Sequence, residues 1–252
     1  MAISCARCEP SRSGETPIDI AYQPIFNIRS WTAHGYEALV RGPRGEGVAS
    51  VLNAIGKAER HSFDQRVRVM AIEKAAVLGL VASGASLSIN ILPSAVIEAE
   101  RCLGNTLAAA ARVGLDPCRI VFELTEGARF DASRTRALVE TYRALGFRTA
   151  LDDFGNGYAN LLTLADIPTD FVKLDIGLIR NIDVSRERQT IVHGFAAIAE
   201  SLGRRVVAEG VETAAELAAI RALGIELVQG FHLGRPSLTE LQREPYALAQ
   251  AA

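Results

Sequence analysis

Two adjacent aspartates, Asp152 and Asp153, stand where an apolar run of the sequence ends. Residues 149–151 precede them and the turn-forming residues 155–157 follow, so the pattern predicts a buried strand that ends in two carboxylates. Like charges repel and resist desolvation, so a buried pair needs positive charge beside it. In a water-excluded cleft, a pair of divalent cations supplies that charge. A single aspartate could instead cap the next helix, but acids at other predicted strand ends favour the metal interpretation.

Polar residues also stand at the ends of the other predicted strands, and each of these residues follows apolar ones. These positions are Glu37, Asn90, Glu123, Lys173, Glu209 and Gln229. A polar residue on a buried strand is costly unless it is paired, so we expect these side chains to converge on one rim. The five carboxylates and the carboxamide of Asn90 form a hard, oxygen-only shell that suits Mg²⁺ or Mn²⁺. This number of acids exceeds the need of one octahedral ion and favours two ions, roughly 3.5–4 Å apart.

Two such metals beside a lysine favour hydrolysis of a phosphate ester. The metals would polarise the phosphoryl oxygens and activate water, and Lys173 would orient that water or neutralise charge that develops at phosphorus. Arg41, two residues after Leu39, could clamp a phosphate. Lys173 could also form an internal ion pair with the acid cluster, and the two roles are compatible.

The elements that must position these residues alternate along the chain. Strands are predicted at residues 18–26, 32–40, 86–91, 119–124, 147–152, 171–175, 205–209 and 226–231, with the main helices at 63–78, 133–145, 186–202 and 213–223. Glycines just past the helices favour left-handed caps, and Thr213 with Glu216 predicts a capping box. Eight strands that alternate with helices in about 250 residues indicate a TIM-like (β/α)8 barrel. The short link between the first two strands indicates an antiparallel first pair, or a strand outside the parallel set.

Composition limits the functional classes. The chain has 252 residues, 49% of them hydrophobic, and a net charge of −2, so we expect affinity neither for nucleic-acid polymers nor for membranes. Its amino-terminal residues lack the apolar core of a signal peptide, which predicts a cytoplasmic location. Cys5 and Cys8 form a C-x-x-C pair without a second ligand pair, so a reduced pair in a loose tail is expected, whereas Cys118 is expected in the core. We divide the chain into a tail (1–16), a barrel domain (17–245) and a second tail (246–252).

The ordered set of motifs is similar to that of the EAL-domain cyclic di-GMP phosphodiesterases. The matching blocks are Tyr22-Gln-Pro-Ile, Glu37-Ala-Leu with Arg41, Asn90, Glu123-Leu-Thr-Glu, Asp152-Asp-Phe-Gly, Lys173-Leu-Asp, Ala208-Glu-Gly-Val-Glu-Thr and Gln229-Gly. They run in order from about residue 18 to residue 236, nearly the whole chain. The resemblance implies a barrel whose first strand is antiparallel, and cleavage of cyclic di-GMP to linear pGpG with Mg²⁺ or Mn²⁺.

The resemblance also implies a role for each matching residue. Glu37, Asn90, Glu123 and Asp152 would hold one metal, and Asp153, with Asp152 as a bridge, would hold the second. Lys173 and Glu209 would bind or orient water, whereas Gln23, Leu39 and Arg41 would contact substrate. Glu126 would anchor the loop after the paired aspartates, and Gln229 would complete the site. Ca²⁺, with its larger and looser coordination shell, is expected to inhibit.

One loop departs from the pattern of this family. Asn156, Ala159 and Asn160 stand where Thr, Ser and Ser are common, in a loop that the resemblance implies would couple metal binding to contacts of a homodimer. This departure bears on the level of activity and its regulation. The alternative to an active enzyme is a catalytically weak or silent EAL-type receptor that binds cyclic di-GMP or a protein partner. Without the resemblance, another two-metal hydrolase, or an enolase-like lyase with Lys173 as base, would also fit the polar residues.

Overall fold

Eight strands close into one barrel, with each strand hydrogen-bonded to the next in the sequence and the last to the first. The computed structural model describes residues 16–56, 59–91, 103–125, 132–156 and 161–246. Cys5, Cys8 and most of the predicted first tail lie outside these ranges, as does nearly all of the second tail. None of the helices within the described ranges combines the length and the apolar character that crossing a bilayer requires.

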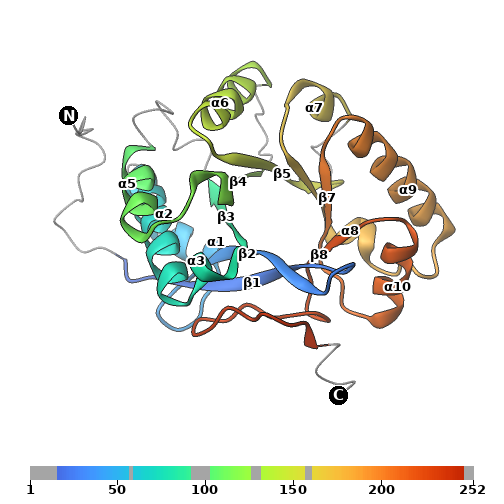
Figure 1. Ribbon diagram of the computed structural model, residues 1–252, viewed down its shortest axis with the longest axis horizontal. Helices are drawn as coiled ribbons and strands as arrows, with labels where there is room; N and C mark the ends of the chain where they lie inside the picture. Colours follow the sequence, from blue (N-terminus) through green and yellow to red (C-terminus); the bar gives the residue numbers. More distant parts are fainter. Residues whose placement is uncertain (1–15, 57–58, 92–102, 126–131, 157–160, 247–252) are drawn as a thin grey trace.

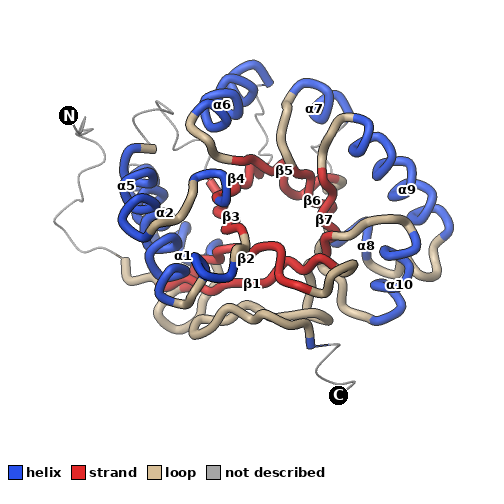
Figure 2. The backbone as a smooth tube through the Cα atoms, in the orientation of Figure 1, coloured by secondary structure: helices blue, strands red, loops and turns tan. Residues whose placement is uncertain are grey.

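The strands form the inner ring of the fold, and helices surround most of it (Figures 1 and 2). The strands are β1 (Asp19–Asn27), β2 (Thr32–Arg41), β3 (Ser86–Ile91), β4 (Ile120–Thr125), β5 (Arg148–Phe154), β6 (Phe171–Leu174), β7 (Arg205–Ala208) and β8 (Leu227–Val228). The first strand is antiparallel to both of its neighbours, β2 and β8, and all other pairs are parallel. The prediction of a TIM-like barrel with an antiparallel first strand is confirmed.

The helices follow the predicted order, with boundaries that differ by a few residues. They are α1 (Val48–Ala54), α2 (Arg60–Val77), α3 (Leu80–Ser83), α5 (Gly104–Val113), the 3₁₀ turn η3 (Pro117–Arg119), α6 (Ala132–Ala144), α7 (Leu161–Asp166), α8 (Ile176–Ile179), α9 (Arg186–Ser201) and α10 (Ala214–Ala222). The predicted glycines after the helices adopt positive φ angles, and the capping box of Thr213 and Glu216 is present. Glycine tolerates this conformation because it lacks a Cβ atom.

A helix and a loop both lie beside β1, and on the helix side Tyr22 Oη donates to Ala71 O of α2 while Lys74 Nζ donates to Ile20 O. The segment after β8 runs along this strand (Figure 2), where the backbone N–H of Tyr22 donates to Ser237 O at 2.8 Å and Ser237 N–H donates to Tyr22 O at 3.0 Å. Because the short link between β1 and β2 contains no crossover helix, this segment adds to the cover that α2 gives the strand. The C-terminal segment therefore belongs structurally to the barrel.

Two predictions about local structure are wrong. The eighth strand ends at Val228 rather than at residue 231, because Gly230 lies against the backbone of Val211 and the chain turns there. Cys118 lies in η3 and is only half-buried, so it is not a core residue. The apolar residues that follow it do enter the core, beginning with Ile120.

Arg119 joins the start of β4 to the loop before β3. Its guanidinium donates to the carbonyl oxygens of Ala85 (3.0 Å), Val81 (3.0 Å) and Leu80 (2.7 Å). We expect Arg119→Met to lower the free energy of unfolding by about 1.5–3 kcal/mol, because these carbonyl groups would lose their charged donor. Urea unfolding monitored by circular dichroism measures this loss.

The matched control is Arg112→Met. Arg112 pairs with Glu73 at the surface, where the two side chains are 56% and 45% exposed. Solvent screening makes such a pair worth about 0–1 kcal/mol. Equal losses in the two variants would contradict the structural role given to Arg119.

Candidate active site

The barrel interior contains an apolar layer with a polar layer directly beyond it. The apolar layer consists of Ile25, Val121, Ala150, Phe171, Val207 and Leu227. On the five parallel strands of this set, the residues two positions further on are Glu123, Asp152, Lys173, Glu209 and Gln229. Alternate residues of a strand face the same side of the sheet, so this spacing directs the five polar side chains into the mouth of the barrel. On β1, which runs the other way, Gln23 precedes Ile25 by two.

Lys173 lies at the centre of the polar layer, and its side chain is only 2% exposed. Its Nζ atom is 2.7 Å from Glu209 Oε1, 2.9 Å from Glu123 Oε2, 3.1 Å from Asp152 Oδ1 and 3.4 Å from Glu37 Oε2. One ammonium group therefore contacts four carboxylates that come from four different strands or strand ends. The structure brings together the acids that the sequence placed at separate strand ends.

Glu37 is held from two sides by amide groups. Asn90 Nδ2 donates to Glu37 Oε1 at 2.8 Å, and Gln229 Nε2 donates to Glu37 Oε2 at 2.8 Å. Lys173 and these two donors hold the pKa of Glu37 below its ordinary value, although burial, the largest influence, acts in the opposite direction. Glu37 is thus fixed as a carboxylate, and Asn90 retains its amide oxygen for a cation.

Asp153 joins the site through an irregularity in β5. In a regular strand Asp152 and Asp153 would point to opposite faces. The pairing register between β5 and β6 shifts between Leu151 and Phe154, and Asp153 adopts a left-handed conformation with φ of 56°. As a result, carboxylate oxygens of Asp152, Asp153 and Glu209 all lie within 4.8 Å of one another. Such backbone strain costs on the order of 1–3 kcal/mol and is concentrated at functional sites.

The acids outnumber the cation beside them, and this imbalance shifts their protonation. Burial, followed by the charge of Asp152, raises the pKa of Asp153. Burial also raises the pKa of Glu123 well above its ordinary value and that of Glu209 to about 8, while Lys173 acts in the opposite direction. The pKa of Lys173 lies well above its ordinary value, because four carboxylates outweigh its burial. The site therefore has capacity for further positive charge.

The residues present fit divalent cations. Glu123 is fully buried, and among the described residues its Oε1 atom has no hydrogen-bond partner, although Oε2 contacts Lys173. An unpaired buried carboxylate oxygen is costly and calls for a cation. The donor set of carboxylate and amide oxygens, without sulfur or imidazole, matches Mg²⁺ or Mn²⁺.

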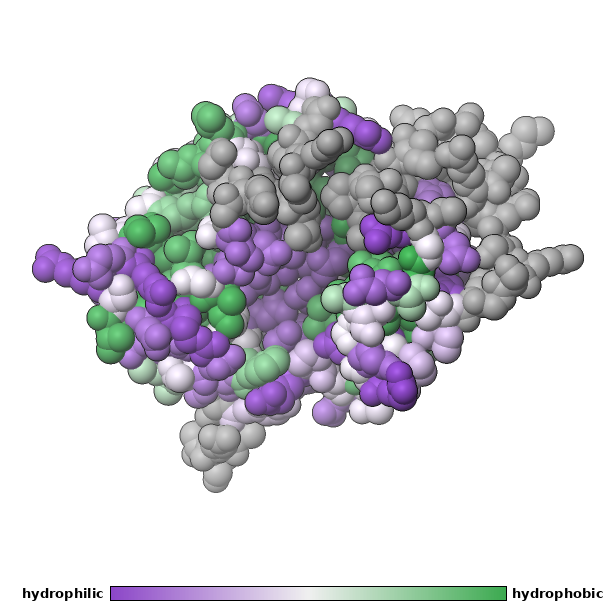
Figure 3. All heavy atoms as spheres, turned by 180° about the vertical axis from the view of Figure 1, so that it is seen from behind, coloured by the Kyte–Doolittle hydropathy of each residue, from purple (hydrophilic) through white to green (hydrophobic). Residues whose placement is uncertain are grey.

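A pocket of about 330 Å³ opens over this layer and is lined by Gln23, Glu37, Asp152, Asp153, Lys173, Ile176, Glu209, Gly210, Glu212, Gln229, Gly230 and Phe231. Figure 3 shows the face on which the strands end, with a hollow of mainly hydrophilic residues near its centre. The volume suits a small-molecule ligand.

Reasoning from the sequence missed Ile176, Gly210 and Phe231 as lining residues. Only their closeness in the sequence to predicted site residues such as Glu209 and Gln229 could have indicated them.

Other predicted site residues lie differently. Leu39 and Arg41 do not line this pocket, and the guanidinium of the half-buried Arg41 donates to its neighbour Val40 O at 2.9 Å. Asn156 is exposed after the end of β5. Glu126, Ala159 and Asn160 lie outside the described residues, so their predicted roles stay predictions.

The raised pKa of Glu209 predicts a pH dependence of stability in the metal-free protein. Glu209 has an ordinary pKa near 4.5 when unfolded and about 8 when folded, so the folded state binds more protons between these values. Stability should therefore fall as pH rises through this window. We expect a lower Tm at pH 8 than at pH 6.5 in chelator, measured by scanning calorimetry.

Two controls accompany this measurement. Glu209→Gln should flatten the dependence, because the amide does not titrate. Saturating Mn²⁺ should also reduce it, since the cation would replace the proton as the compensating charge. A Tm that rises with pH over this range in chelator would contradict the electrostatic account of the site.

Comparison with solved structures places this geometry among related proteins. A standalone EAL protein from Vibrio cholerae O395, solved in a c-di-GMP-bound form, has a TM-score of 0.89 and 42% identity, and the match covers 94% of this chain and 99% of that one. Klebsiella pneumoniae BlrP1, solved as a manganese and cy-diGMP complex, has a TM-score of 0.83 and 31% identity, with 93% of this chain and 60% of that chain covered.

Comparison of sequences gives the same result. Cyclic di-GMP phosphodiesterase NbdA from Pseudomonas aeruginosa is 32% identical over 226 residues, which cover 87% of this chain and 29% of that protein. Cyclic di-GMP phosphodiesterase PdeR from Escherichia coli is 31% identical over 227 residues, 86% of this chain and 33% of that protein. The chain thus spans about a third of these curated relatives. The EAL domain model matches residues 14–236, so the chain belongs to the EAL domain family.

Proposed function

We propose that this protein hydrolyses cyclic di-GMP to linear pGpG with two divalent cations, Mg²⁺ or Mn²⁺. The observation that carries the proposal is the contact of one buried lysine, Lys173, with four carboxylates at the floor of an open pocket in an EAL domain. The names of the relatives support the substrate, because two of them are cyclic di-GMP phosphodiesterases. All proposed metal ligands are present in the chain.

The two cations would share the acid cluster. Glu37, Asn90, Glu123 and Asp152 would hold the first, and Asp153 would hold the second with Asp152 between them. When bound, the cations supply Lewis acidity that polarises the phosphoryl group and lowers the pKa of a water molecule. The acid cluster is already assembled by the fold, so binding requires no rearrangement of the strands.

Lys173 would act on the charge that develops at phosphorus. Its four carboxylate contacts fix the ammonium in one place, and a fixed charge in a dry site stabilises a transition state without reorganisation. Glu209 accepts a hydrogen bond from Lys173 at 2.7 Å and lines the pocket with its 17% exposed side chain. Glu209 would orient the attacking water through its other oxygen and accept the proton that this water releases, while Lys173 remains an ammonium.

Substrate contacts would come from β1, β2 and the end of β8. Gln23 Nε2 donates to Gly234 O at 3.3 Å, a contact that ties the amide to the segment after β8 while the residue still lines the pocket. Gln229 lines the pocket and is anchored on Glu37. Arg41 would release Val40 O to clamp a phosphate, and Leu39 would pack against the nucleotide. We also propose that the protein acts as a homodimer in the cytoplasm.

A direct assay tests the proposal. Incubation with cyclic di-GMP and Mn²⁺ should yield pGpG by chromatography. Excess EDTA should stop the reaction, and Ca²⁺ should inhibit it, because calcium prefers a larger and less regular shell than magnesium or manganese. Undiminished turnover in EDTA would contradict the two-metal mechanism. A protein that binds cyclic di-GMP but forms no product would favour the silent receptor.

Two substitutions separate chemistry from binding. Lys173→Ala should lower kcat by at least about 100-fold with little change in KM, since its charge acts mainly on the transition state. Arg41→Ala should instead raise KM, because a phosphate clamp serves the ground state and the transition state alike. Steady-state kinetics of both variants, with circular dichroism to confirm folding, measures these effects. Wild-type kcat in the Lys173 variant would refute the role given to Lys173.

A further inference from the structure

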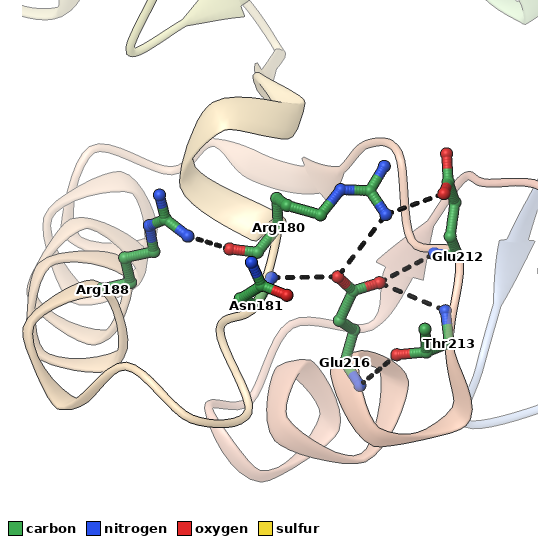
Figure 4. Close-up of polar contacts among 6 residues, drawn as sticks. All are labelled: Arg180, Asn181, Arg188, Glu212, Thr213 and Glu216. Carbon is green, nitrogen blue, oxygen red and sulfur yellow. Dashed lines mark hydrogen bonds and ion pairs between the residues drawn. The ribbon is translucent and has the colours of Figure 1, made fainter.

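Glu216, in the first turn of α10, has a buried side chain whose carboxylate joins two segments far apart in the sequence. Its Oε2 atom accepts hydrogen bonds from the backbone N–H groups of Glu212 (2.9 Å) and Thr213 (3.2 Å). Its Oε1 atom accepts one from the backbone N–H of Asn181 at 3.0 Å (Figure 4). A capping box alone needs only the contact near its own helix start, so the bond to Asn181 is additional.

The environment of Glu216 keeps it charged. Its side chain is 2% exposed, and burial alone would raise its pKa. The three backbone N–H groups and Arg180 nevertheless hold the pKa below its ordinary value. A carboxylate that accepts several charge-assisted hydrogen bonds is a firm connection, because each bond is stronger than a neutral one. Glu216 therefore links the loop after β7 rigidly to the loop after α8.

Arg180 makes the same connection from the other side. Its Nη1 atom lies 2.7 Å from Glu212 Oε2 and 3.8 Å from Glu216 Oε1, and its carbonyl oxygen accepts a hydrogen bond from Arg188 (Figure 4). The next residue, Asn181, has a left-handed backbone with φ of 56°. The chain is thus held at the point where it leaves α8, by contacts with the end of the loop between β7 and α10 and with the first turn of α10.

The short helix α8 lies between the two loops that carry acids of the site. A Cβ atom added to Gly210, directly after Glu209, would lie 2.4 Å from Ile176 Cγ1. A Cβ atom added to Gly155, two residues after Asp153, would lie 2.5 Å from Leu178 Cδ1. The side chains of Ile176 and Leu178 in α8 therefore pack directly against the backbone at Gly210 and Gly155. Any shift of α8 would change the separation of Asp153 and Glu209, whose carboxylate oxygens lie within 4.8 Å.

We infer that Glu216 is a positioning residue that fixes α8 as a spacer between Asp153 and Glu209, and so shapes the site for the second divalent cation. The inference rests on the proposed function for the identity of the cation. Glu216 itself does not line the pocket and would touch neither cation nor substrate. It acts through backbone contacts, which set where the carboxylates of the neighbouring loops can lie.

Mn²⁺ binding tests the inference independently of turnover. Free Mn²⁺ is measured by electron paramagnetic resonance during titration of the full chain. Glu216→Ala should weaken binding of the second Mn²⁺ by about 10-fold, the lower end of the effect of residues that support metal ligands. Glu216→Gln should weaken this binding as well, because its amide oxygen can still accept from Glu212 and Thr213 but its amide nitrogen cannot accept from the N–H of Asn181. In the hydrolysis assay kcat should fall with the affinity while KM stays within about twofold.

Asp116→Ala is the control for general loss of stability. The side chain of Asp116 caps η3 through the N–H of Cys118 at 2.9 Å, before the start of β4 and at the opposite end of the barrel. This variant should lower Tm without changing Mn²⁺ binding. Equal weakening of Mn²⁺ binding by Asp116→Ala and Glu216→Ala would overturn the inference, as would a Glu216→Ala protein with wild-type affinity.

A second pair of variants keeps the test decisive if Glu216→Ala does not fold. Ile176 and Ile198 are 39% and 41% exposed, but only Ile176 presses on Gly210. Ile176→Ala should weaken binding of the second Mn²⁺, whereas Ile198→Ala should not, and equal affinities in the two proteins would reject the spacer. A wild-type protein that binds Mn²⁺ without cutting cyclic di-GMP would refute the proposed function, and the Mn²⁺ titrations would still decide the role of Glu216.

Discussion

Repulsion among carboxylates at the mouth of the barrel is the constraint on which the rest of the site depends. Lys173 contacts four of them, yet one positive charge cannot neutralise the whole cluster. The fold holds these acids in place through interactions remote from the repulsion, namely the strand ladders and the apolar layer beneath. Amide donors from Asn90 and Gln229 then fix Glu37. The strands and these donors thus hold the acids close together, and a cation would relieve the repulsion.

The barrel and most of its polar layer were predictable from sequence because both follow from local rules. Strand and helix periods, glycine caps and the Thr213 capping box are patterns within a few neighbouring residues. A barrel gathers the ends of its parallel strands on one rim, so acids at separate strand ends had to converge once the fold was known. Glu123 and Lys173 are 50 residues apart in the sequence, yet their side chains meet at 2.9 Å, which illustrates how topology supplies the long-range information.

The remaining features depend on the three-dimensional contacts of particular residues. The side-chain alternation of a strand gives opposite directions to Asp152 and Asp153, and only the shifted register and left-handed backbone bring both into the site. The early end of β8 follows from the approach of Gly230 to Val211, which are 19 positions apart. No local pattern could indicate that Glu216 would reach Asn181 in addition to its own helix start. These features lie at the ends of strands and helices, where contacts with other segments override sequence periodicity.

The site residues within the strands and those at the strand ends are held in place in different ways. The strand residues Glu37, Glu123 and Lys173 are buried within the sheet, where hydrogen bonds on both sides of each strand restrict their movement. Asp153 and Glu209 lie where their strands end, and their positions depend on side chains of α8 that press on Gly155 and Gly210. Loop segments open at lower free energy than sheet, so the proposed second cation position is the one that loop contacts would tune. On the proposed two-cation function, this barrel would keep the first cation position rigid while small changes around α8 alter the second.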